Sequence, residues 1–224
     1  NSPFGIVLVH NGNLVNTVNL RNQVQEGSKR HINTNSDSEL LLNVFADCLA
    51  EECLNTNELN NIKITNAVDK LHKRVEGAYS VILLIVGYGL VAFRDPNGIR
   101  PLIYGKKDNN NYMVASESVA LDCLGYEIID DVNPGQVIVF HKDEIFKSSF
   151  DSGVLNPCIF EYVYLARPDS IMNGISVYKA RLKMGDYLSQ TIKETISSGD
   201  IDVVMPIPDS SRPAAMQVAR QLGI

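Results

Sequence analysis

The sequence predicts a layered α+β domain that is followed by the beginning of an α/β domain. Residues 40–49 and 65–75 carry apolar side chains at helical spacing, so each stretch indicates a helix with one buried face. Strand-like runs then succeed one another between residues 79 and 147, and strands in succession beside two helices favour layered packing. Further on, a helical pattern over 176–196 precedes the nearly all-apolar run 201–207, which is typical of a strand in a parallel sheet.

Composition narrows the class of protein. The 224 residues are 45% hydrophobic and 21% charged, with a formal net charge of -6. This length suits one large domain or one and a half smaller ones, and the negative charge argues against nucleic acid or an anionic membrane as the main partner. No apolar run is long enough to span a bilayer, and the four cysteines form no CxxC pair. We therefore expect a compact, soluble, cytoplasmic protein.

The first part of the chain opens with a strand. Residues 5–10 form an apolar run, which we interpret as a buried strand that ends in a tight turn at Asn11-Gly12. A polar helical stretch follows and is broken at 27–30. Ser36 and Glu39 then stand at the spacing of a capping box, and this predicts the start of the helix over 40–49.

Several short strands follow the second helix. The Asn-rich loop at 55–62 separates the two helices. Strands are predicted at 79–86, 90–94, 101–105, 112–116, 127–130, 136–141 and 145–147, with turns at 87–89 and 109–111 and a short helix at 118–124.

A polar stretch at 148–157 is the best candidate for a linker. We expect a strand at 158–165 after it, and later a helix that begins at Pro213 with a serine cap and ends at Gly223.

The pair Asn11-Gly12 allows two interpretations. It is a common hairpin turn, and this is its simplest role. It also supplies a side-chain amide and a backbone N–H that can bind a developing oxyanion during acyl transfer, because glycine leaves the backbone open to a substrate.

Asp37 and the segment 208–213 also carry candidate chemistry. A carboxylate at Asp37 suits the first turn of a helix by itself, because the helix dipole favours negative charge there. Residues 208–213 (PDSSRP) place a serine-rich loop between a strand and a helix N-terminus, where free N–H groups favour a phosphate. A well-capped helix without a ligand is the alternative.

Four motifs in order carry a family resemblance. Residues 10–14 (HNGNL), 36–39 (SDSE) and 93–102 (FRDPNGIRPL) resemble the class II glutamine amidotransferases, which are N-terminal-nucleophile (Ntn) hydrolases with an αββα sandwich. Residues 160–170 (FEYVYLARPDS) narrow this to the family of glutamine phosphoribosylpyrophosphate (PRPP) amidotransferases. The resemblance implies a glutaminase domain over 1–150, lacking its N-terminal part, and the beginning of a type I phosphoribosyltransferase domain over 158–224.

The resemblance implies a two-step reaction. Glutamine yields glutamate and ammonia through a cysteine thioester, and the ammonia displaces pyrophosphate from PRPP to give 5-phosphoribosylamine, the first committed step of purine synthesis. It also implies a homotetramer inhibited by purine nucleotides, with glutamine and PRPP as its small-molecule partners.

The same resemblance implies the roles of individual residues. Asn11 and Gly12 would form the oxyanion hole, and Asp37 would hold the α-amino group of glutamine. The pyrophosphate of PRPP would bind to Asp209, Ser210 and Ser211 in a single loop. Mg²⁺ would bind at Ser210.

The chain departs from the family pattern in its cysteines. The nucleophile of the family is the first residue of the mature protein, whereas this sequence begins at Asn1. Both ends look cut, so we interpret the chain as an internal fragment and expect it to have neither activity by itself. Some members bind a [4Fe–4S] cluster through the position of Cys158, but the surrounding residues resemble the cluster-free members.

Two rival interpretations stay open. Glucosamine-6-phosphate synthase and asparagine synthetase share the glutaminase half with a different acceptor domain, although the loop at 208–213 argues against both. A non-catalytic paralogue that binds PRPP as a regulator is the second rival.

Overall fold

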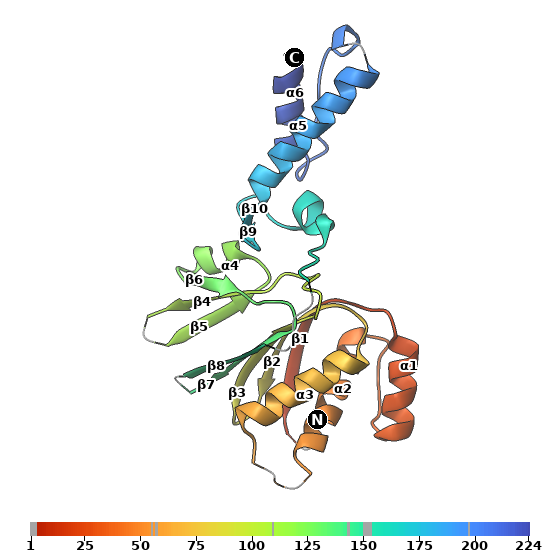
Figure 1. Ribbon diagram of the computed structural model, residues 1–224, viewed down its shortest axis with the longest axis vertical. Helices are drawn as coiled ribbons and strands as arrows, with labels where there is room; N and C mark the ends of the chain where they lie inside the picture. The colour runs from red at the N-terminus through yellow and green to blue at the C-terminus, as the bar shows by residue number, and fades with distance from the viewer. Residues whose placement is uncertain are drawn as a thin grey trace.

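The computed structural model describes residues 4–54, 56, 58–108, 110–142, 144–149, 154–196 and 198–224 (Figure 1). The predictions that involve Asn1, Asn55, Asn109 and the middle of the linker at 150–153 lie outside these residues.

A five-stranded antiparallel sheet forms the centre of the molecule. It follows the order β1-β2-β3-β7-β8. Neighbouring strands in it are antiparallel. Its strands are β1 (Ile6–Leu14), β2 (Gly77–Ile85), β3 (Gly89–Arg94), β7 (Gln136–His141) and β8 (Glu144–Ser149).

Two helices cover one face of this sheet. They are α2 (Asp37–Glu52) and α3 (Asn61–Arg74), and they lie on the sheet in Figure 1. Their apolar faces pack with β1, β2 and β3 into the main hydrophobic core. All six apolar positions predicted on the first helix are buried: Leu40, Leu41, Val44, Phe45, Cys48 and Leu49. The polar stretch after β1 forms α1 (Thr17–Asn22) and a π-helical turn (Gln23–Gly27).

A second sheet packs on the opposite face. It contains β4 (Ile103–Lys107), β5 (Asn111–Ala115) and β6 (Glu127–Asp131), in the order β5-β4-β6. Tyr104 of this sheet shares a core with Ile138 and Phe140 of the first sheet, and α4 (Ser118–Cys123) packs on β4 and β5. The layers run helices, sheet, sheet, helix, which confirms the predicted αββα arrangement.

The last part of the chain projects away from the sheets (Figure 1). It begins with a π-helical turn (Glu161–Leu165) and a short ribbon of β9 (Ile171–Met172) and β10 (Ile175–Ser176). Two helices follow that pack side by side and run in the same direction, α5 (Val177–Thr195) and α6 (Arg212–Leu222), with a short 3₁₀ turn (Ser198–Asp200) between them. A small core of four buried side chains holds the base of this part: Tyr162, Ala166, Met172 and Val177.

Two strand predictions in this part are wrong. Residues 158–165 are largely helical, because the buried Arg181 of α5 donates hydrogen bonds to the carbonyl oxygens of Tyr162 and Ala166, both at 2.7 Å, and so curls the chain. Residues 201–207 form no strand in the described chain, because no neighbouring strand is hydrogen-bonded to them. Their apolar side chains are exposed instead, as at Val203 and Met205.

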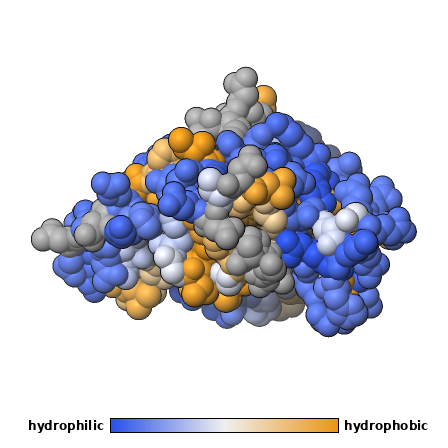
Figure 2. All heavy atoms as spheres, turned by 90° about the horizontal axis from the view of Figure 1, so that it is seen from below, coloured by the Kyte–Doolittle hydropathy of each residue, from blue (hydrophilic) through white to orange (hydrophobic). Residues whose placement is uncertain are grey.

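The prediction that residues 5–10 are a buried strand is only half right. Ile6 is buried against the helices, whereas Val7 and Val9 are 59% and 60% exposed on the other face of β1. Figure 2 shows the molecule from below, relative to Figure 1. Hydrophobic residues gather in the middle of this view, and hydrophilic residues surround them.

The start of α2 differs in detail from a capping box. The hydroxyl of Ser36 accepts a hydrogen bond from the backbone N–H of Ser38, as an N-cap does. The carboxylate of Glu39 does not return to Ser36, and it accepts instead from the backbone N–H groups of Asn33 and Thr34 at 2.8 and 2.7 Å. Glu39 therefore anchors the loop that precedes the helix.

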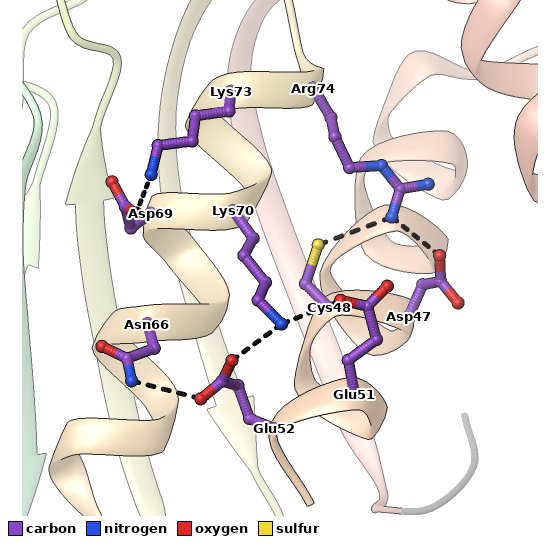
Figure 3. Close-up of polar contacts among 9 residues, drawn as sticks. All are labelled: Asp47, Cys48, Glu51, Glu52, Asn66, Asp69, Lys70, Lys73 and Arg74. Atoms are coloured by element: carbon purple, nitrogen blue, oxygen red, sulfur yellow. Dashed lines mark hydrogen bonds and ion pairs between the residues drawn. The ribbon is translucent and has the colours of Figure 1, made fainter. Parts of the chain in front are cut away.

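Polar pairs join the outer sides of α2 and α3 (Figure 3). Lys70 lies 2.8 Å from carboxylate oxygens of both Glu51 and Glu52, and Arg74 lies 2.7 Å from Asp47. The two helices also bury apolar side chains in the main core beneath these pairs. The polar pairs therefore add to a helix interface that is formed mainly by the core.

Candidate functional site

A cavity of about 180 Å³ opens between the middle of β1 and the end of β5. Asn11 and Ser116 both line it, although they are 105 residues apart in sequence. The other lining residues are Val9, His10, Ser80, Ile82 and Leu102. The cavity therefore contains the first candidate residue that the sequence identified.

Asn11 lies within a strand and not in a hairpin turn, so the turn interpretation is wrong. It pairs with Ser80 inside the continuous ladder between β1 and β2. Its Oδ1 accepts a hydrogen bond from the guanidinium of Arg100 at 2.5 Å, and its Nδ2 donates to the hydroxyl of Ser116 at 3.2 Å. Because arginine has only donors, the amide has one defined orientation, with Nδ2 on the side of Ser116.

Gly12 is required by the backbone of the neighbouring strand. It pairs with Tyr79 and has a φ of +152°, in the region that favours glycine. A β-carbon at this position would overlap the carbonyl oxygen of Ala78 and lie 2.8 Å from the Cα of Tyr79. The sequence pattern HNG is therefore explained in part by strand packing.

Asp37 lies next to the same strand. One oxygen of its carboxylate accepts the backbone N–H of Leu14 at 3.2 Å, and the other lies 3.8 Å from Nδ1 of His10. The imidazole of His10 is also 3.1 Å from the hydroxyl of Ser38. Burial lowers the pKa of His10, although the negative charge of Asp37 acts in the opposite direction. The carboxylate of Asp37 thus lies beside His10, the residue that precedes Asn11 in β1.

Sequence reasoning missed Arg100 and Ser116 as parts of this site. By sequence alone, the turn-rich loop 94–101 is a structural segment, and Ser116 belongs to a strand-to-helix junction that helix capping alone could explain. The structure instead gives α4 an N-cap at Glu117 without a side-chain cap bond, and leaves Ser116 on Asn11. No local pattern could reveal contacts between residues that are 89 and 105 positions apart.

The sequence allows a local ion pair between Arg94 and Asp95, but the structure does not form it. Each is fully buried and binds backbone groups. Arg94 donates to the carbonyl oxygens of Gly98, Arg100 and Val132 and to Oδ1 of Asn173. Asp95 accepts the N–H groups of Tyr79, Asn97, Ile99 and Arg100. The loop is therefore a rigid support, and the structural interpretation of it is confirmed.

The second candidate site lies in the part of the chain that projects from the sheets, at the start of α6 (Figure 1). Asp209 is exposed and forms an ion pair with Arg212 at 2.8 Å. Ser211 is the N-cap residue, but its hydroxyl bonds to the carbonyl of Ile207, so the predicted side-chain cap is wrong. Pro213 lies in the first turn and Gly223 ends the helix in the left-handed conformation, as predicted.

The described residues form no preassembled metal site. They contain no group of three or more His, Cys, Asp or Glu side chains that could hold an ion. The loop at 209–211 does offer hydroxyl and carboxylate oxygens, which are the ligands that Mg²⁺ prefers, and Mg²⁺ commonly takes its other ligands from phosphate oxygens and water. This loop therefore fits an ion that enters together with a phosphate and does not fit one held by protein alone.

A family model for the glutamine amidotransferase domain matches residues 2–123. The chain therefore belongs to the glutamine amidotransferase family.

Within this family, the relatives it resembles bear one name. The chain is 50% identical to the amidophosphoribosyltransferase of Haemophilus influenzae and 49% identical to that of Escherichia coli, in each case over 100% of this chain and 45% of the relative. The enzyme of the yeast Saccharomyces cerevisiae is 44% identical over the same shares. The chain thus spans about 45% of the length of the curated relatives that it matches.

Solved structures agree with this likeness. The glutamine PRPP amidotransferase of Bacillus subtilis, complexed with ADP and GMP, superposes with a TM-score of 0.81 at 30% identity, over 100% of this chain and 45% of that one. A structure described as the allosteric regulatory enzyme of purine biosynthesis gives the same TM-score at 31% identity and covers 44% of that chain. None of the helices in the described part of this chain is long and apolar enough to cross a membrane.

Proposed function

We propose that this chain takes part in the amidophosphoribosyltransferase reaction, in which glutamine, PRPP and water give 5-phosphoribosylamine, glutamate and pyrophosphate. The observation that carries the proposal is the fixed amide of Asn11 in the cavity beside β5. A preorganised donor at this position is what acyl transfer from glutamine requires, because negative charge develops on the carbonyl oxygen. The likeness to amidophosphoribosyltransferases over the whole chain supports the same reaction.

In the glutaminase step, a cysteine thiolate attacks the side-chain amide carbon of glutamine and creates a tetrahedral oxyanion. Nδ2 of Asn11 and the backbone N–H of Gly12 are the proposed donors to that oxygen. The four cysteines of this chain do not line the cavity, and two of them, Cys48 and Cys53, are buried in the main core. The nucleophile of the proposed reaction is therefore none of these four thiols.

Asp37 is the proposed anchor for the α-amino group of glutamine. Its side chain is 25% exposed, so a substrate ammonium can reach the carboxylate while the N–H of Leu14 holds one of its oxygens. A bond from a carboxylate to an ammonium is charge-assisted and stronger than a neutral one.

In the transferase step, the loop at the start of α6 is the proposed site of the pyrophosphate of PRPP. The N-terminus of an eleven-residue helix gives this loop a positive dipole end, and Arg212 adds a cation. Asp209, Ser210 and Ser211 would contact the phosphates. Ser210 would supply one oxygen to Mg²⁺, which when bound neutralises charge on the pyrophosphate.

The domain boundaries belong to the same proposal. The glutaminase domain would occupy residues 1–150 and the phosphoribosyltransferase part residues 158–224. We propose further that the protein works in the cytoplasm as a homo-oligomer without an iron–sulfur cluster, because residues 157–164 resemble the cluster-free members.

The test uses the protein expressed from the complete open reading frame that contains these 224 residues. Glutamate release and PRPP-dependent pyrophosphate release are measured for it and for Asn11→Ala. We expect the variant to lose a factor of about 10² to 10³ in kcat for glutamate release. Asn19→Ala, on the exposed side of α1, is the matched control and should keep full activity.

Three results would overturn the proposal. A protein that binds PRPP but releases neither product would favour the non-catalytic regulator. Glutamate release that persists unchanged in Asn11→Ala would show that the oxyanion hole lies elsewhere. Ammonia transfer to a sugar phosphate other than PRPP would point to the rival amidotransferases.

A further inference from the structure

Arg100 joins two parts of the chain that are far apart in sequence. One nitrogen of its guanidinium donates to Oδ1 of Asn11 at 2.5 Å. The other terminal nitrogen lies 2.7 Å from the carboxylate of Glu161, in the π-helical turn that follows the sheets. The contact with Asn11 bridges 89 positions of the chain. The guanidinium therefore holds the amide of β1 and a carboxylate of the C-terminal part together.

Hydrogen bonds to both its N–H and its carbonyl oxygen fix the backbone of Arg100. Its N–H donates to the buried carboxylate of Asp95 at 3.3 Å. Its carbonyl oxygen accepts from Nε of Arg94 at 2.6 Å and from the hydroxyl of Ser80 at 3.0 Å. These partners are all buried, so the side chain of Arg100 starts from a rigid point.

Glu161 is equally well anchored. Its side chain is only 6% exposed, and the side chain of Arg100 is 19% exposed. Arg181 of α5 stabilises the turn that carries Glu161, because its Nε donates a hydrogen bond to the carbonyl oxygen of the next residue, Tyr162. Burial raises the pKa of Glu161, while the positive charge of Arg100 acts against this shift. A buried carboxylate needs such a partner, because an unpaired charge in a dry environment is costly.

Arg100 itself does not line the cavity, whereas Asn11 and Ser116 do. Among the described residues that line the cavity, the side chain of Arg100 is hydrogen-bonded only to Asn11. Arg100 therefore acts on the cavity through Asn11. With Oδ1 held by arginine, the amide cannot turn over and present oxygen to the place where Nδ2 now lies. An inverted amide would place an acceptor against a developing oxyanion and would repel it.

We propose that Arg100, held by Glu161, is a positioning residue that keeps the donor nitrogen of Asn11 turned toward the substrate. The inference rests on the proposed function, because it assumes that Asn11 binds the oxyanion. Arg100 makes no contact with the substrate in this scheme. Its whole effect on the reaction passes through the orientation of one amide.

The test is a double-mutant cycle on glutamate release by the protein from the complete reading frame. Asn11→Ala, Arg100→Met and the double variant are compared with the wild type. We expect Arg100→Met to lower kcat by about 10- to 100-fold, with the KM for glutamine within about twofold, because only the transition state uses the oriented donor. The double variant should be no slower than Asn11→Ala, since Arg100 has nothing left to orient.

Two further variants separate positioning from a general loss of structure. Glu161→Gln keeps the shape of the anchor and removes its charge, so a loss of kcat of about 3- to 10-fold is expected with unchanged KM. Arg21→Met removes an arginine that binds the carbonyl of Thr34, away from the cavity, and should leave both constants unchanged. If Arg100→Met does not fold, Glu161→Gln alone carries the test, and an unchanged kcat in it overturns the proposal.

The outcomes distinguish the two proposals. An unchanged kcat in Asn11→Ala refutes the oxyanion role and the proposed function with it. A slow Asn11→Ala with a normal Arg100→Met refutes only the positioning role. Losses that multiply in the double variant also refute it, because they would show that Arg100 acts independently of Asn11.

Discussion

Gly12 of β1 lies so close to Ala78 of β2 that any β-carbon on Gly12 would overlap the carbonyl oxygen of Ala78. The two strands continue past this point without a break, with Gly12 opposite Tyr79 and Asn11 opposite Ser80. The glycine thus lets β1 keep its register while the adjacent Asn11 reaches the cavity. Strand packing and the candidate site depend on the same position.

Gly12→Ala should therefore destabilise the fold. The new methyl group forces the two strands apart, and alanine disfavours a φ of +152°. We expect the free energy of unfolding in urea to fall by about 2–4 kcal/mol. Gly27→Ala is the control, because a β-carbon there meets nothing within 4 Å and its φ is not positive, and it should change stability by less than about 0.5 kcal/mol. Equal effects of the two substitutions would contradict the close approach of β1 and β2.

Asp95→Asn should weaken the loop that supports Arg100. The fully buried carboxylate accepts N–H groups from Tyr79, Asn97, Ile99 and Arg100, and an amide has only one oxygen with which to accept them. We expect a loss of about 3 kcal/mol in the free energy of unfolding. Asp122→Asn, on the exposed side of α4, is the control and should be neutral. A neutral Asp95→Asn would show that the loop does not depend on this carboxylate.

The layered domain could be predicted because its signals are local. The six apolar positions between Leu40 and Leu49 are one helix face, and each strand from β2 to β8 is a short run bounded by turn residues. The prediction failed where a distant residue decides the structure. Residues 158–165 look like a strand by composition, and Arg181 holds them in a helical turn from 15 to 19 positions away.

The candidate site could be predicted only in part, for the same reason. Asn11 and Asp37 can be predicted because they belong to short motifs, and the structure places Asp37 beside His10, the residue before Asn11. Arg100 and Ser116 were not found, because their relation to Asn11 exists only once β1, the loop after β3 and the end of β5 have packed together. The run 201–207 has the composition of a buried strand, but composition does not supply the neighbouring strand it would need.

The ion pairs formed by residues of α2 and α3 should contribute unequally to stability, according to their burial (Figure 3). Arg74 and Asp47 are 23% and 18% exposed, and Arg74 also contacts the sulfur of Cys48 at 3.6 Å. Lys73, which pairs with Asp69 one turn away on the same helix, is 72% exposed. We expect Arg74→Ala to cost about 1–2 kcal/mol and the matched Lys73→Ala less than about 0.5 kcal/mol in urea unfolding.

Salt gives an independent check on this pair of variants. The small effect of Lys73→Ala should vanish in 1 M NaCl, because the Debye length there is only about 3 Å. Most of the effect of Arg74→Ala should remain, because its partner is partly buried. Equal losses for the two variants, or equal sensitivity to salt, would contradict the ranking by burial.

His72 should make the fold sensitive to mild acid. It packs beneath Phe93 and lies 2.8 Å from the hydroxyl of Tyr79, and burial lowers its pKa from 6.5 to about 4, although the charge of Asp69 acts in the opposite direction. Between these two values the unfolded chain binds a proton that the folded chain excludes, so the free energy of unfolding decreases as the pH falls. The full contribution is present above pH 6.5, and about 3 kcal/mol is lost by pH 4. Urea unfolding of the wild type and of His72→Gln across this pH range measures the contribution of His72 protonation to the free energy of unfolding. The wild type should lose about 3 kcal/mol more than the variant, which keeps a polar side chain but has no proton to gain, and parallel pH profiles would refute the assignment.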